Sequence, residues 1–265
     1  MTATVSAHGI YATALKTMAG KLTDLLRLKS LPLGLKLFEN VDEMGKAQGL
    51  RRPGADKAFT TCQLVTQLRS AGFTLGIMRD NLRPGANCGA NIGLEEIPEK
   101  VLSGQQMTCV WFENQEAAHA HQVQIPRVRA GRYSRMGASP LRSGRLDAPD
   151  LCLFYASPGQ MILLINGLQY RNFWRYDFTI TGGSACADSW GRASAARETS
   201  LSIPCYAARR YGGVQDNELF MACPSDEFAR ANDGLKALAK NGLRYPYPPF
   251  PAFADPAEGM SKSNG

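Results

Sequence analysis

Apolar side chains near the start of the chain recur every three or four residues. Between residues 13 and 29 they alternate with lysines, an aspartate and other polar residues, and they are Leu15, Met18, Leu22, Leu25 and Leu26. This spacing puts them on one face of a helix, so it predicts an amphipathic helix within an N-terminal segment of residues 1–30. Pro32 ends the pattern, and the apolar run Leu33–Phe38 that follows predicts a strand.

Two later stretches repeat one order of features: an apolar strand, a cysteine, a helical segment, a second strand and a second cysteine. The first stretch contains Leu35–Phe38, Cys62, residues 62–71, Phe73–Met78 and Cys88. The second contains Leu151–Phe154, Cys186, residues 185–196, Ser200–Ile203 and Cys205. The shared order predicts an internal duplication, with a first unit over residues 31–126 and a second over residues 151–247. A chance match of short motifs is the alternative.

The segment between the two units, residues 127–150, is rich in glycine, serine, proline and arginine. Six arginines occur from Arg127 to Arg145 without an acidic residue, and they supply much of the formal charge of +7. They predict either an anion-binding lid or a solvated loop. Tyr133 is the one aromatic ring among them, whereas proteins that bind single strands interleave several. A nucleic-acid partner is therefore disfavoured.

These features predict one α/β or α+β domain, in which two duplicated helix–strand units are joined by an arginine-rich connector over residues 127–150. A proline-rich tail over residues 248–265 follows the second unit. No apolar run reaches the roughly 18 residues that a membrane-spanning helix needs, so no membrane association is expected. A homo-oligomer is compatible with this pattern.

The number of cysteines helps to predict the cellular compartment of the protein. There are seven of them, an odd number, and the first twenty residues lack the basic and then apolar stretches of a secretory signal. We therefore expect a cytoplasmic protein with reduced thiols rather than a disulfide framework.

Several motifs resemble a known family over about residues 30–247. In the first unit they are Cys62 and the run Asn87-Cys88-Gly89-Ala90. In the second unit they are Pro149–Met161, Gly183-Ser-Ala-Cys-Ala-Asp188, Pro204-Cys205, Arg209-Arg210-Tyr-Gly, Gln215-Asp-Asn-Glu218 and Gly242-Leu-Arg-Tyr-Pro. Together they resemble the prokaryotic domain-of-unknown-function 169 family. The resemblance implies a prokaryotic, cytoplasmic protein and implies little about its activity.

Helix and strand lengths predict where the cysteines meet. A helix of about ten residues rises about 15 Å, and the strand after it runs back about 17 Å. Cys62 and Cys88 should therefore lie at the same end of the first unit, and Cys186 and Cys205 at the same end of the second. If the units pack with twofold symmetry, both pairs face one cleft.

Three interpretations of these four cysteines are open. They are small buried side chains in the core, or ligands of zinc or an iron–sulfur cluster, or reactive thiols. No C-x₂-C motif supports the metal interpretation. A start-of-helix position, predicted for Cys62 and Cys186, lowers a thiol pKa and favours the reactive interpretation.

Cys186 is the stronger nucleophile candidate, with Cys62 as its counterpart. Gly182, Gly183 and Ser184 precede it and let backbone amides approach a ligand, and Asp188 is placed to act as a base or as a first-turn carboxylate. His119 and His121 are two residues apart, so they point to different sides of a helix, and a metal role for them is disfavoured.

Candidate ligand-binding residues lie beside the second cysteine of each unit. Arg209 and Arg210 follow Cys205, while Arg83 and Asn87 precede Cys88. Arginine binds carboxylates and phosphates through two parallel hydrogen bonds, although pairing with Asp216 or Glu218 is equally compatible with the sequence. No dinucleotide-binding or phosphate-loop motif is present.

The sequence therefore predicts an enzyme that acts on a small anionic acid, with aromatic acids among the candidates. Cys186, Asp188 and Cys62 would be catalytic in a lyase, decarboxylase or redox step, and Arg209, Arg210, Arg83, Asn87 and Ser184 would bind substrate. The alternative is a non-enzymatic protein that binds zinc, an iron–sulfur cluster or another cofactor through Cys62, Cys88, Cys186 and Cys205. A second alternative is an anion-binding regulatory domain.

Overall fold

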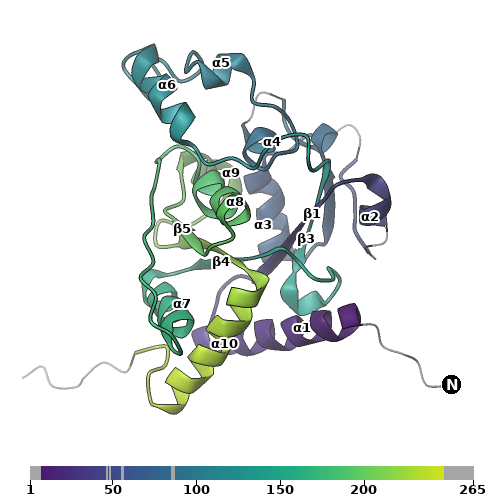
Figure 1. Ribbon diagram of the computed structural model, residues 1–265, viewed down its shortest axis with the longest axis vertical. Helices are drawn as coiled ribbons and strands as arrows, with labels where there is room; N and C mark the ends of the chain where they lie inside the picture. Colours follow the sequence, from purple (N-terminus) through teal and green to yellow (C-terminus); the bar gives the residue numbers. More distant parts are fainter. Residues whose placement is uncertain (1–6, 46, 48, 55–56, 85–86, 248–265) are drawn as a thin grey trace, which may run out of the picture.

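A six-stranded antiparallel sheet forms the centre of the computed structural model, which describes residues 7–45, 47, 49–54, 57–84 and 87–247 (Figure 1). Its strand order is β2-β3-β1-β4-β6-β5. The strands are β1 (Leu33–Phe38), β2 (Leu75–Met78), β3 (Arg135–Pro140), β4 (Leu151–Ala156), β5 (Ser200–Ser202) and β6 (Leu219–Pro224). The chain is thus a single mixed α/β domain, which confirms the predicted fold class.

The strand order is symmetric about the central β1–β4 pair. On one side of this pair lie β3 and then β2, and on the other side lie β6 and then β5, so each of the first three strands has a counterpart three strands later. Gly34 in β1 leaves room for the side chains of Leu141 and Pro149, because a Cβ there would lie 2.9 Å from Leu141 Cδ2 and 3.0 Å from Pro149 Cβ. A duplication would produce such symmetry, but the duplication itself stays a prediction.

Strand β3 corrects the prediction of a connector at residues 127–150. It lies in the middle of that segment and pairs with β1 on one side and β2 on the other. Five of its six residues are buried, so the middle of the segment is not a solvated loop, whereas residues on either side of the strand, such as Arg129 and Arg145, are exposed. The sequence hides the strand because Met136, Gly137 and Ala138 carry none of the β-branched side chains that mark one.

The two faces of the sheet carry separate hydrophobic cores, because successive strand residues point to opposite sides. In β4, Leu153 and Tyr155 belong to one core, and Cys152 and Phe154 belong to the other. The first core is covered by α3 (Thr61–Ala71), the π-helix η3 (Ala187–Gly191), α8 (Arg192–Ala196) and α9 (Tyr206–Gly212). The second is covered by α1 (Ala7–Leu26), α7 (Pro158–Gln169) and α10 (Ser225–Lys240) (Figure 1).

Helices α7 and α10 cross in close contact. A side chain at Gly234 would overlap the backbone of Gly167, so two glycines are needed where the helices meet. The contact secures the layer opposite the candidate site.

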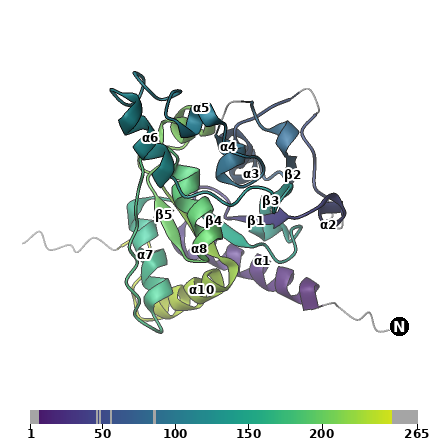
Figure 2. The ribbon, with the colours of Figure 1, turned by 45° about the horizontal axis from the view of Figure 1, so that its top comes forward.

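Short helices complete the chain between the strands. They are α2 (Val41–Gly45), η1 (Arg79–Asn81), α4 (Cys88–Asn91), α5 (Glu99–Leu102), α6 (Gln115–Gln124) and η2 (Leu141–Ser143). Figures 1 and 2 show α5 and α6 at one end of the molecule, above α4. Across the described residues, no helix combines the length and apolar character that crossing a membrane requires.

The predicted element boundaries hold with small shifts. Strand β1 occupies Leu33–Phe38 as predicted, and the predicted strand Phe73–Met78 begins two residues later, at Leu75. The helix predicted over residues 185–196 is interrupted by the π-helical turn Ala187–Gly191. The proline-rich tail over residues 248–265 lies outside the described residues.

Candidate functional site

Four separate elements carry the four cysteines of the predicted site. Cys62 is the second residue of α3, Cys88 begins α4, Cys186 immediately precedes η3, and Cys205 is the residue that precedes α9. The start of α3 is fixed by a capping box in which Thr60 Oγ1 accepts a hydrogen bond from the Gln63 amide at 3.2 Å. We call Cys62, Cys88, Cys186 and Cys205 the cysteine quartet.

The structure brings the cysteine quartet together. Cys186 interacts electrostatically with each of the other three thiols. Cys62 interacts with Cys88 and with Cys205, and Cys88 interacts with Cys205. Every pairing within the quartet is therefore close. The opposed directions of helix and strand predict only the pairs Cys62–Cys88 and Cys186–Cys205, whereas the meeting of the two pairs is expected only if the units pack with twofold symmetry.

Packing of α9 on α3 contributes to this convergence. A Cβ at Gly212 would lie 3.2 Å from Cys62 Cβ, so the end of α9 comes directly against the start of α3. The Thr66 hydroxyl lies within hydrogen-bond distance of the carbonyls of both Cys62 and Gly212, and by sharing its one proton between them it links the two helices. The absence of a side chain at Gly212 thus allows α9 to pack directly against α3.

Burial makes these thiols weak acids, which is opposite to the effect predicted from a helix start. Burial raises the pKa of the Cys62 thiol to about 12, with smaller contributions from Cys88 and Cys205. Burial also raises the pKa of Cys88, and it holds the pKa of Cys186 well above its ordinary range. Desolvation of the thiolate outweighs the helix dipole here, so none of these three thiols is a preformed nucleophile.

The quartet does not form a mononuclear metal site in its present geometry. Among the described residues, no three histidine, cysteine, aspartate or glutamate side chains are placed to hold one metal ion. A tetrahedral zinc with Zn–S distances of about 2.3 Å requires sulfurs only about 3.8 Å apart. The quartet is close enough for mutual electrostatic interaction without this convergence.

A buried ion pair lies beside the quartet. Arg69 donates two hydrogen bonds to Glu218, at 2.9 and 3.1 Å, and its guanidinium lies 4.2 Å from the centre of the Tyr155 ring. Tyr155 stacks on Phe220 with ring centres 4.4 Å apart, and it interacts electrostatically with Cys62. Glu218 therefore has a structural role that neutralises Arg69 in the core.

Asp188 is buried and fixes the loop before η3. It accepts hydrogen bonds from the Thr181 amide at 3.0 Å and from the Thr181 hydroxyl at 2.9 Å. Burial raises the pKa of this carboxyl, while the hydrogen bonds from Thr181 and Gly182 oppose that rise. Its described hydrogen bonds hold residues 181–182, so the structure gives it a positioning role and leaves a role as base a prediction.

His121, which the sequence led us to consider only as a metal ligand, contacts the loop before η3, and sequence reasoning missed this contact. His121 lies on α6, where burial lowers its pKa and the nearby Asp188 carboxylate opposes that change. A side chain at Gly183 would overlap the His121 ring, so the loop passes directly over the imidazole. Nothing in the local sequence of α6 indicates this contact, because Asp188 is 67 positions farther along the chain.

A cavity of about 500 Å³ opens next to the quartet. Three predicted ligand-binding residues line it: Asn87, Ser184 and Arg210. They lie within a few residues of Cys88, Cys186 and Cys205 along the chain, and Met107, Val110, Trp111, Tyr206 and Tyr211 complete much of the wall. We call this space the aromatic cavity.

Two predicted ligand-binding residues do not line the aromatic cavity. Arg209 forms an ion pair with Asp216 at 2.8 Å, which is the structural alternative considered for it. Arg83 is exposed, and its backbone amide donates to the Phe59 carbonyl at 2.9 Å. Arg209 and Arg210 are consecutive in α9 and therefore lie on different sides of this helix.

The arginines of residues 127–145 do not act together. Arg127 is held on α6 by hydrogen bonds to the Gln122 carbonyl and side chain, both at 2.7 Å. Arg132 instead reaches Glu39, which follows β1, at 3.5 Å, and Arg135 begins β3. Strand β3 divides this stretch, and the contacts of Arg127 and Arg132 do not support an anion-binding lid, which stays a prediction.

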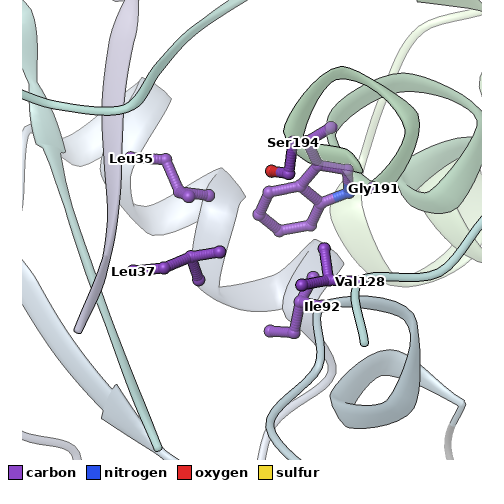
Figure 3. Close-up of a pocket in the computed structure, with 7 residues that line it drawn as sticks. Leu35, Leu37, Ile92, Val128, Gly191 and Ser194 are labelled. Atoms are coloured by element: carbon purple, nitrogen blue, oxygen red, sulfur yellow. The ribbon is translucent and has the colours of Figure 1, made fainter. Parts of the chain in front are cut away.

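A much smaller cavity lies under η3 and is not a binding site. Figure 3 shows Leu35 and Leu37 facing Ile92 and Val128 across it. Its volume is about 10 Å³, and its wall is largely apolar. This space is at the lower limit for one water molecule, so it is a packing gap.

Comparison with known proteins identifies the family of this chain. The sequence model of the domain-of-unknown-function 169 family, described as "Uncharacterised ArCR", matches residues 21–233. The chain belongs to this family. An uncharacterised protein of Methanocaldococcus jannaschii is 23% identical over 211 residues, which cover 79% of this chain and 88% of that protein. No solved structure matches.

Proposed function

We propose that this DUF169 protein binds an iron–sulfur cluster through the cysteine quartet. The observation that carries the proposal is that every pair of the four thiols interacts, although they come from four different elements. Three of them, Cys62, Cys186 and Cys205, also pack against one hydrophobic core, so the four thiols share one region of the protein. Four thiolates are the usual ligand set of [2Fe–2S] and [4Fe–4S] clusters.

The raised pKa values support a cofactor more than a free nucleophile. Cys62, Cys88 and Cys186 are all held in the protonated form by burial and by one another. A bound metal replaces the thiol protons and supplies the positive charge that buried thiolates lack. The same values count against the cysteine-nucleophile mechanism that the sequence favours.

A cluster suits the geometry better than one zinc ion. A single tetrahedral ion draws four sulfurs to about 3.8 Å from one another, whereas each thiolate of a cubane cluster binds a different iron and lies farther from the others. The described residues contain no three side chains at single-ion spacing, while the quartet as a whole is mutually close. The larger cofactor fits this combination.

Anaerobic purification followed by reconstitution with iron and sulfide tests the proposal. We expect a brown protein with absorption near about 400 nm and about four irons and four sulfides per chain for a cubane cluster. Serine at any quartet position should reduce the absorption and the iron content. A colourless, iron-free product after reconstitution would overturn the proposal.

Two other cysteines provide matched controls. Cys109 is exposed, and Cys152 is buried in the core on the opposite face of the sheet. Cys109→Ser and Cys152→Ser should keep the full absorption and iron content. If they lose iron as the quartet variants do, the colour comes from nonspecific binding.

The second candidate function is an enzyme that acts on a small anionic acid. The specific observation in its favour is the aromatic cavity, which carries Arg210 beside the quartet. Turnover of an aromatic acid by protein without iron would favour this candidate with a thiol mechanism. Turnover that requires iron would mean that the protein is both an enzyme and an iron–sulfur protein.

A further inference from the structure

The aromatic cavity is built from elements of both halves of the chain. Asn87 precedes α4, and Val110 and Trp111 lie between α5 and α6. Ser184 precedes η3, and Tyr206 and Arg210 lie on α9. Its volume of about 500 Å³ falls in the range of small-molecule sites, which is about 300–1,000 Å³. The cavity is therefore large enough for a molecule of one or two rings.

Exposed rings form one side of this cavity. Trp111 is 56% exposed and Tyr206 is 54% exposed, and their rings meet edge to face with centres 5.5 Å apart. Tyr211, also exposed, lines the same cavity. Rings in a core would be covered, so these leave apolar faces free for a flat ligand.

A positive charge without a carboxylate partner stands at the same place. Arg210 donates a hydrogen bond to the Tyr206 hydroxyl at 2.9 Å, and its guanidinium lies 5.8 Å from the ring centres of Tyr206 and Tyr211. Among the ion pairs of the described residues, none involves Arg210, whereas its neighbour Arg209 is neutralised by Asp216. Guanidinium groups bind carboxylates through paired hydrogen bonds, so Arg210 favours an anionic ligand.

A polar atom without a partner adds a further requirement. The Asn87 side-chain oxygen is buried and accepts no hydrogen bond from any described residue. Leaving such an acceptor unpaired costs about 1–3 kcal/mol, which a ligand donor would recover once the side chain of this cavity-lining residue turns toward the ligand. A hydroxyl or amino group on the ligand supplies that donor.

We infer that the aromatic cavity binds an aromatic carboxylate that carries a hydroxyl or amino substituent. Its carboxylate pairs with Arg210, its ring lies against Trp111 and Tyr206, and its substituent donates to Asn87. This ligand goes beyond the proposed cofactor, and it would lie next to the cysteine quartet because Asn87 and Tyr206 adjoin Cys88 and Cys205. The two sites are chemically separate, so each can be tested without the other.

Titration with 4-hydroxybenzoate tests the inference, with tryptophan fluorescence and melting temperature as readouts. The chain has three tryptophans, and Trp111 is the one that lines the cavity. We expect saturable fluorescence quenching and a higher melting temperature, since a ligand that binds only the native state stabilises it. Neutral 4-hydroxybenzamide and the non-planar cyclohexanecarboxylate should bind at least about tenfold more weakly.

Adjacent arginines supply a matched pair of variants. Arg210→Ala should weaken 4-hydroxybenzoate binding at least about tenfold, and Arg210→Lys should recover part of it. Arg209→Ala removes the same charge one residue away and should leave the affinity within about twofold. Asn87→Leu should abolish the preference for 4-hydroxybenzoate over benzoate. Equal affinities in the Arg209 and Arg210 variants, or equal binding of the acid and the amide, would overturn the inference.

Measuring iron content distinguishes a failure of the ligand inference from a failure of the iron–sulfur proposal. The Arg210 and Asn87 variants should reconstitute with the same absorption near about 400 nm as the parent protein. The ligand titration is repeated on Cys109→Ser and on protein that has not been reconstituted. Ligand binding without iron would leave the inference standing even if the cofactor proposal fails, and absence of binding in both forms would overturn the inference alone.

Discussion

The side-chain amide of Asn91 donates a hydrogen bond to the sulfur of Cys186 across 3.7 Å. Asn91 ends α4, the helix that Cys88 begins, so this contact joins a thiol of the second half to the element that carries a thiol of the first. Donors to a ligand sulfur stabilise the more negative, reduced state of an iron–sulfur cluster.

We therefore expect Asn91→Ala to lower the reduction potential of the reconstituted protein. Loss of a hydrogen bond worth about 1 kcal/mol corresponds to about 40 mV for one electron. A dye-mediated redox titration measures it, and Asn166→Ala on α7 is the control on the far face. An unchanged potential with full iron content would show that this bond is absent from the loaded protein.

Alkaline pH should destabilise the iron-free protein. The folded-state pKa of Cys62 is raised to about 12 from its ordinary value of 9.0. The stability contribution of a raised pKa is present below the unfolded value and is lost as pH rises, because only the unfolded thiol then ionises. Between about pH 9 and pH 12, each such thiol should reduce the free energy of unfolding by about 1.4 kcal/mol per pH unit.

Urea unfolding at pH 8 and pH 10 measures this loss. Cys62→Ser should show a smaller loss than the parent, because it lacks one of the ionising groups. A serine at exposed Cys109 should behave as the parent does. Identical losses in the parent and in Cys62→Ser would mean that Cys62 is not buried as a thiol.

The ion pair between Arg69 and Glu218 should be costly to break. Both side chains are largely buried, with exposed fractions of 6% and 14%, so removing one charge leaves the other without a partner in the core. Glu218→Gln should reduce the free energy of unfolding by about 3 kcal/mol. The surface pair of Lys236 and Asp233 is the contrast, and Asp233→Asn should cost less than about 0.5 kcal/mol.

Gly183 should be intolerant of any side chain. Because a Cβ would overlap the His121 ring, Gly183→Ala should displace the loop that lines the aromatic cavity and should reduce both stability and 4-hydroxybenzoate binding. A cost of about 1–3 kcal/mol is typical of such overpacking. The double variant with His121→Ala removes the obstacle, so calorimetry should show most of the stability restored.

Much of the fold follows from local pattern, and the rest depends on contacts between distant residues. The strand Leu33–Phe38 and the helical stretch after residue 60 are visible because apolar spacing and caps are local signals. Strand β3 is not visible, because its small residues form a strand only between two partners already in place. The six residues of such a strand do not by themselves show the spacing or residue types that predict a strand.

Part of the candidate site is likewise predictable from the sequence, and part depends on contacts between distant residues. The nearness of Cys62 to Cys88 and of Cys186 to Cys205 follows from the opposed directions of one helix and one strand in each half, which the sequence displays. The meeting of the two pairs depends on how the halves pack, which it does not display. The raised pKa values of the thiols are not displayed either, because burial of Cys186 depends on packing across the whole domain. The contact of His121 with the loop before η3 and the place of Trp111 in the cavity wall were missed, because each residue lies far in the sequence from the residues that it joins in space.

The symmetric strand order has a consequence for the order of synthesis. Cys62 and Cys88 leave the ribosome first, and they have only each other until Cys186 and Cys205 follow. The middle pair of the sheet, β1 with β4, forms once residues 151–156 are available. A nascent chain of the first half therefore carries half a ligand set, and the cofactor that we propose can be inserted fully only after translation has passed residue 205.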